Sequence, residues 1–186
     1  CWTRDARGFF YIRSPDPTPG EDAATSHARK ELRYHRLGES ESRDRVVHRW
    51  TGNVRWAWCM LSDDGRRLVA VGERGGDTDV RVIDLVTPMH PRLDATAARV
   101  LGDRPANHTP FSLVGDTLYV LTDLDALHRR VIAVDLARPH AQPRVIVPES
   151  EHTIERAVAV GGRIALHLIA DAQSRPERTV REHAQQ

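Results

Sequence analysis

Short apolar runs separated by tight polar turns recur four times along the chain. In each repeat, a turn containing Asp or Gly is followed by an apolar run, at residues 9–12, 68–71, 118–121 and 164–168. Most runs alternate apolar with polar residues or are β-branched, and Gly, Pro, Asp and Ser separate them, which is typical of β-strands. The best helix candidate is the short segment from Asp94 to Arg99.

The spacing of the repeats predicts their architecture. The turn glycines at positions 8, 65, 115 and 161 are 57, 50 and 46 residues apart. A third strand is predicted at 32–38, 80–85 and 130–136, and a fourth at 45–48, 98–101 and 144–147. A period of about 50 residues with four strands is typical of a β-propeller blade.

We therefore predict an all-β chain made of about three and a half four-stranded blades. The predicted blades cover residues 1–53, 54–107, 108–152 and, truncated, 153–186. In the truncated blade we expect the strand at 164–169 to have an unprotected edge. The alternative is a β-sandwich of about a dozen short strands.

Composition and charge narrow the function classes. The chain has 186 residues, of which 40% are hydrophobic and 28% charged, an ordinary globular balance. Its net charge of +1 argues against a protein that binds nucleic acid or a membrane surface through charge. No apolar run approaches the ~20 residues that cross a bilayer. Because the chain starts without Met and without a signal peptide, we expect a piece of a longer protein, located in the cytoplasm, or in the periplasm if a leader was removed.

Cysteine and histidine do not form a metal-binding pattern. The only cysteines, Cys1 and Cys59, exclude a disulfide scaffold and a Cys-rich zinc module. The ten histidines are scattered, with no His-x-x-x-His pair. We predict no metal and no cofactor. Cys59 is interpreted as a small buried hydrophobe, with a reactive thiol as the alternative.

Four motifs, in order, resemble the propeller of the prolyl oligopeptidase family of serine peptidases (family S9). The run Leu-Arg-Tyr-His-Arg-Leu-Gly at 32–38 resembles that family's Tyr-Tyr-His-Leu-Gly segment, and 61–66 its Ser-Asp-Asp-Gly-Arg turn. Residues 122–136 are similar to its third-blade signature, and Val-Pro-Glu-Ser at 147–150 to the segment that follows. Oligopeptidase B shares the first run but fits 131–150 less well.

The resemblance implies a seven-bladed propeller that covers an α/β-hydrolase domain and admits only short peptides, which are cleaved after proline. The implied partners are that hydrolase domain of the same polypeptide and a proline-containing oligopeptide. This sequence has no Gly-x-Ser-x-Gly, so the hydrolase domain is absent from the chain and we assign no catalytic residue. We expect the chain alone to be inactive. The alternative class is a stand-alone propeller that serves as a protein-interaction platform.

The resemblance also points to a substrate-facing wall. On the predicted inner strand at 55–61, alternation places Trp56 and Trp58 on one face. Trp56 and the loop at 72–76 match positions that face the family's substrate cavity. Glu73 and Gly76 stand where the family often has Arg and, in some members, Cys, and Arg74 is the candidate replacement one position on. The alternative is that both tryptophans pack between blades.

Overall fold

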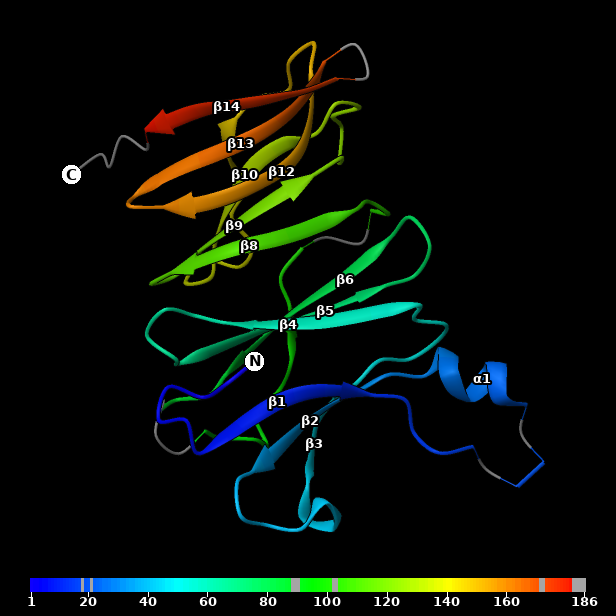
Figure 1. Cartoon of the computed structure of the whole chain (residues 1–186). Helices are drawn as coiled ribbons and strands as arrows, with labels where there is room; N and C mark the ends of the chain where they lie inside the picture. The colour runs from blue at the N-terminus through cyan, green and yellow to red at the C-terminus, as the bar shows by residue number, and fades with distance from the viewer. Residues whose placement is uncertain (18, 21, 88–90, 102–103, 171–172, 182–186) are drawn as a thin grey trace. The chain divides into compact units, whose positions relative to one another are not determined.

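A computed structural model describes residues 1–17, 19–20, 22–87, 91–101, 104–170 and 173–181 of the chain. The chain divides into two compact units, residues 1–103 and 104–186. Two antiparallel sheets lie in each unit, and every sheet consists of strands that are consecutive in the sequence (Figure 1). The units are described separately.

The first sheet of unit 1 has the order β1-β2-β3. Its strands are β1 (Gly8–Arg13), β2 (Glu31–Arg36) and β3 (Arg45–Arg49), with a 3-10 turn, η1 (Glu41–Arg43), before β3. An antiparallel bridge between Trp2 and Phe9 adds the start of the chain to the free edge of β1. The first residues thus occupy the place of the innermost strand of this sheet.

The second sheet of unit 1 has the order β4-β5-β6-β7. Its strands are β4 (Trp56–Leu61), β5 (Arg67–Glu73), β6 (Thr78–Asp84) and β7 (Ala98–Arg99). The facing sides of the two sheets meet in a core whose fully buried members include Phe10, Leu32, Leu68 and Ile83. Alternate residues of one strand, such as Leu68 and Ala70 of β5, face this core.

Unit 2 repeats this arrangement. One sheet contains β8 (His108–Val114), β9 (Thr117–Thr122), β10 (Arg130–Asp135) and β11 (Arg144–Val147). The other contains β12 (Thr153–Val160), β13 (Arg163–Ala170) and β14 (Gln173–Arg181). Their shared core includes Tyr119, Val131, Ile154 and Leu166.

The structure confirms the all-β prediction. Four meanders of consecutive strands are the arrangement of propeller blades, whereas a sandwich with Greek-key connections passes strands between its sheets. The expectation of an unprotected edge at 164–169 is wrong, because β14 pairs along β13 from Arg163↔Arg181 to Ala170↔Gln173. The first strand of that sheet, β12, covers the other edge.

The short helix candidate at 94–99 is not a helix. Residues 94–97 are not helical, and Ala98–Arg99 form strand β7. The helix of unit 1, α1 (Ala23–Ala28), lies instead in the insertion between β1 and β2. With six residues, α1 is too short to be stable as an isolated helix. It is also too short to produce an apolar periodicity in the sequence.

Candidate substrate-facing site

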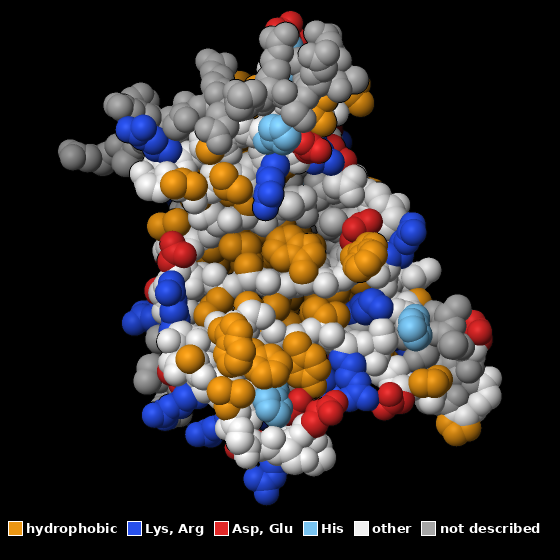
Figure 2. Space-filling model, in the orientation of Figure 1, with side chains coloured by type: hydrophobic (Ala, Val, Ile, Leu, Met, Phe, Trp, Pro, Cys, Tyr) orange, Lys and Arg blue, Asp and Glu red, His pale blue; other side chains and the backbone are white. Residues whose placement is uncertain are grey.

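Trp56 and Glu73 are direct partners at one end of the β4–β5 hairpin. Alternation along β4 turns Ala57, Cys59 and Leu61 toward the core between the two sheets of unit 1. Trp56 therefore lies on the opposite face, where 69% of its surface is exposed. Trp58, which lies on the same face as Trp56, is half-buried. Figure 2 shows hydrophobic side chains gathered over β1 and β4 on the side in view.

The loop after Glu73 is a tight turn. The N–H of Arg74 donates to the carbonyl of Asp77 at 2.8 Å. Between them, Gly75 and Gly76 have φ of +76° and +100°, the left-handed region that glycine adopts without steric cost. No atom lies within 4 Å of the position a Cβ on Gly76 would take, so the backbone here borders open space. Turn geometry therefore accounts for Gly76.

Arg74 connects this loop to other parts of unit 1 through its side chain. Its Nη2 donates to the carbonyl of Thr51 at 3.0 Å and lies 3.7 Å from Oδ2 of Asp79. Asp79 is 2% exposed and is also held by Nε of Arg81 at 2.8 Å and Nε of Arg99 at 3.6 Å. The Arg74 guanidinium thus neutralises a buried carboxylate and fixes the linker that precedes β4. Of the predicted residues, Trp56 and Glu73 are brought together, with Trp56 exposed and Glu73 half-buried.

An aromatic pair, the half-buried His48 and the buried Trp50, supports the same hairpin, and the sequence patterns did not reveal it. The rings of His48 and Trp50 meet edge to face with centroids 4.8 Å apart. Burial lowers the pKa of His48, and the charges of Arg81 and Arg74 lower it further. A Cβ on Gly72 would lie only 2.6 Å from Nε1 of Trp50. Gly72 therefore provides the space in which Trp50 fits beneath β5.

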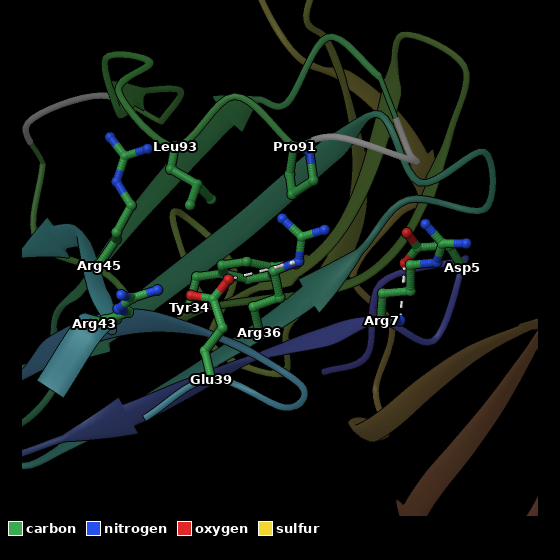
Figure 3. A pocket seen from close by; sticks show the side chains of 9 residues that line it. All are labelled: Asp5, Arg7, Tyr34, Arg36, Glu39, Arg43, Arg45, Pro91 and Leu93. Atoms are coloured by element: carbon green, nitrogen blue, oxygen red, sulfur yellow. Dashed lines mark hydrogen bonds and ion pairs between the residues drawn. The ribbon is translucent and has the colours of Figure 1, made fainter. Parts of the chain in front are cut away.

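A separate hollow lies at the opposite end of the strands of unit 1. The register pair Gly8↔Arg36 brings the turn at 4–7 beside the loop after β2, far from the Trp56 end of the hairpin. The hollow has a volume of about 240 Å³ (Figure 3) and is lined by Asp5, Arg7, Tyr34, Arg36, Glu39, Arg43, Arg45, Pro91 and Leu93. Four arginines outnumber two carboxylates there, and Arg36 lies 3.9 Å from Glu39. The hollow is therefore basic, and its attraction for anions weakens with salt.

Two kinds of site are absent from the residues that the structure describes. In that part of the chain, no group of three or more His, Cys, Asp or Glu side chains is arranged to hold a metal ion. Within the same residues, no helix has the length and apolar character that a membrane crossing needs.

Comparison with known proteins gives a consistent result. The family model for the prolyl oligopeptidase N-terminal β-propeller domain matches residues 1–181. Prolyl oligopeptidase A of Galerina marginata is 25% identical over 166 residues, which cover 86% of this chain and 22% of that protein. Prolyl endopeptidase of Elizabethkingia meningoseptica is 24% identical over 161 residues, covering 83% and 21%.

Solved structures agree with the sequence relatives. A prolyl endopeptidase studied for inter-domain dynamics superposes with a TM-score of 0.80 and 30% identity, covering 97% of this chain and 27% of that one. Oligopeptidase B from Trypanosoma brucei, in a closed form with antipain, superposes at 0.78 with 21% identity, covering 98% and 24%. Because oligopeptidase B is only 21% identical to this chain, its likeness shows the fold alone. The chain spans about a fifth to a quarter of the length of these proteins.

Proposed function

Since this chain belongs to the prolyl oligopeptidase family, as part of its N-terminal β-propeller domain, we propose that it helps to gate a serine peptidase that cleaves short peptides after proline. The sequence lacks Gly-x-Ser-x-Gly, so the nucleophile must be supplied by an α/β-hydrolase domain of the same polypeptide. The names of the sequence relatives support cleavage after proline rather than after basic residues.

The observation that carries the proposal is the exposed Trp56, paired with the half-buried Glu73, at one end of the innermost strand of its sheet. An indole that is 69% exposed offers a flat apolar surface to a peptide. Contacts of this kind, remote from the cleaved bond, raise the reaction rate when their binding energy orients the peptide for attack. Trp56 therefore acts in selection and positioning of the substrate.

Glu73 sets the charge that this wall presents. Where the family often has an arginine, this chain has a half-exposed carboxylate, and Arg74 beside it is engaged with Thr51 and Asp79. A carboxylate next to an indole favours a peptide with a positive group, either a basic side chain or a free α-amino group. We therefore assign this enzyme a preference for short cationic peptides that contain proline.

Fluorogenic peptides test the reaction class. The full-length protein that contains this chain would be given blocked Gly-Pro and Arg-Arg coumarin amides, with a fluorophosphonate probe to label an active serine. Release after Pro, together with labelling, is the expected result. Release only after Arg would instead identify an oligopeptidase B, and a folded protein that neither labels nor cleaves would support the stand-alone propeller. The 186-residue chain by itself should remain unlabelled.

A further inference from the structure

The two cysteines of the chain lie against each other. Cys1 and Cys59 are 58 positions apart, and they are the only cysteines in the sequence. Their Sγ atoms are 3.1 Å apart, both as free thiols. With only two cysteines in the chain, composition alone does not explain their contact. The contact is a specific product of the fold.

Both sulfurs are carried by backbone that the sheets hold in place. The main-chain nitrogen of Cys1 donates to the carbonyl of Phe10 at 2.7 Å, and the N–H of Phe10 donates to the carbonyl of Cys1 at 2.7 Å. Cys59 is in the middle of β4, opposite Ala70 of β5. The two residues thus belong to the innermost strands of the two sheets of unit 1, and Figure 1 shows the chain start beside β4.

We propose that Cys1 and Cys59 form a reversible disulfide that ties the first sheet of unit 1 to the inner strand of the second. A disulfide has an S–S length of about 2.05 Å. The sulfurs, which are 3.1 Å apart, need to approach by about 1 Å, which small rotations of the two side chains supply. The oxidant is a low-molecular-weight disulfide such as oxidised glutathione. This proposal is independent of the peptidase function.

The exchange proceeds in two balanced steps. Cys1 is exposed, so its thiolate attacks the glutathione disulfide, forms a mixed disulfide and releases one glutathione thiolate. Cys59 then loses its proton to solvent and attacks the Cys1 sulfur, which releases the second glutathione. Two protein thiols are oxidised and one glutathione disulfide is reduced. Burial raises the pKa of the Cys59 thiol, which lowers the fraction of thiolate available for the second step at neutral pH.

The bond would act on the stability of unit 1. It would close a long loop that includes the whole first sheet and so restrict the unfolded chain. An increase in Tm of about 10 °C is the scale expected for a disulfide of this kind in a domain of about 100 residues. It would also prevent the two inner strands from separating while both sheets remain folded.

Thiol counting on the purified chain tests the proposal, since no other cysteine is present. After incubation with oxidised glutathione, thiols titrated in denaturant should fall from two to none, and the intact mass should fall by about 2 Da with no adduct. Peptide mapping should link Cys1 to Cys59, and dithiothreitol should restore both thiols. The variants Cys1→Ser and Cys59→Ser should lose the internal bond and the accompanying rise in Tm.

A comparison in urea guards against a bond that would form in any flexible chain. The quantity compared is the rate of internal bond formation divided by the rate of formation of the first mixed disulfide. If the fold aligns the sulfurs, this ratio should be at least tenfold higher in buffer than in denaturing urea. Stable glutathione adducts on both cysteines, bonds formed only between chains, or equal relative rates with and without urea would each overturn the proposal.

Discussion

Trp56 and Glu73 are neighbours across an antiparallel pair, with the indole largely in solvent and the carboxylate half-exposed. Residues directly opposite on one face of a sheet have Cβ atoms about 5 Å apart. One ligand can therefore contact both side chains. The apolar surface provides binding energy and the carboxylate selects charge, so the two contributions can be separated by mutation.

Replacing Trp56 by Ala in the full-length protein should impair long substrates most. We expect kcat/KM to fall five- to hundredfold for peptides that reach beyond the proline, because a buried aromatic contact contributes about 1–3 kcal/mol. Minimal blocked Gly-Pro amides should lose much less. Leu37→Ala is the control, since Leu37 is 50% exposed at the other end of the strands. Equal losses on long and minimal substrates would remove the substrate-facing role.

Changing the charge at Glu73 should change peptide preference. Glu73→Arg should reverse the ratio of kcat/KM between a cationic and an anionic peptide of equal length, by about tenfold for an interaction near 1.4 kcal/mol. Glu73→Gln should give an intermediate ratio. The effect should shrink as ionic strength rises, because exposed charges are screened. A ratio that stays constant across the three proteins would show that Glu73 does not face the peptide.

Gly72→Ala should destabilise unit 1. The added methyl would lie 2.6 Å from Nε1 of Trp50, and overpacking of this kind costs about 1–3 kcal/mol. The free energy of unfolding, measured in urea, should fall by that amount. Adding Trp50→Ala should remove most of the clash, so the double-mutant cycle should show strong coupling. Additive effects would mean that Trp50 is not the residue that excludes a side chain at this position.

Asp44 should make the free energy of unfolding depend on pH in the acid range. Burial raises the pKa of this carboxyl, but hydrogen bonding by Tyr11 and His35, at 2.7 Å each, outweighs it and holds the pKa below its usual value. A carboxyl whose pKa is lowered by folding stabilises the protein above the pKa of the unfolded chain, about 4, and this contribution is lost as pH falls through the folded pKa.

The variant Asp44→Asn tests this assignment through the pH dependence of urea unfolding. The wild-type protein should lose stability as pH falls below about 4, and the variant should lose less on the same acidification, although it is less stable at pH 7. Asp63→Asn, at an exposed turn position, should keep the wild-type slope. An unchanged slope for Asp44→Asn would assign the acid sensitivity to other carboxyls.

Local patterns predicted much of the fold and part of the site. The continuous apolar run at 68–71 marks β5, which is buried on both faces, and the run at 9–12 marks β1, whose first residues are alternately buried. Alternation along β4 placed Trp56 on the face opposite Ala57. The partners of Arg74 were not predictable, since its contact with Thr51 depends on how the linker before β4 crosses the loop. The contact between Cys1 and Cys59 likewise depends on packing between two sheets, which no local pattern encodes.

The meander within each sheet has a consequence for the order in which the chain folds. Every strand of β4-β5-β6-β7 pairs with the strand just before or after it in the sequence, and the same holds in the other three sheets. A hairpin can therefore close as soon as its second strand leaves the ribosome, without waiting for distant sequence. Synthesis adds about 5–20 residues per second, whereas hairpins form in microseconds. The first sheet can thus be complete while later strands are still being translated, and it offers β4 a finished surface on which to fold.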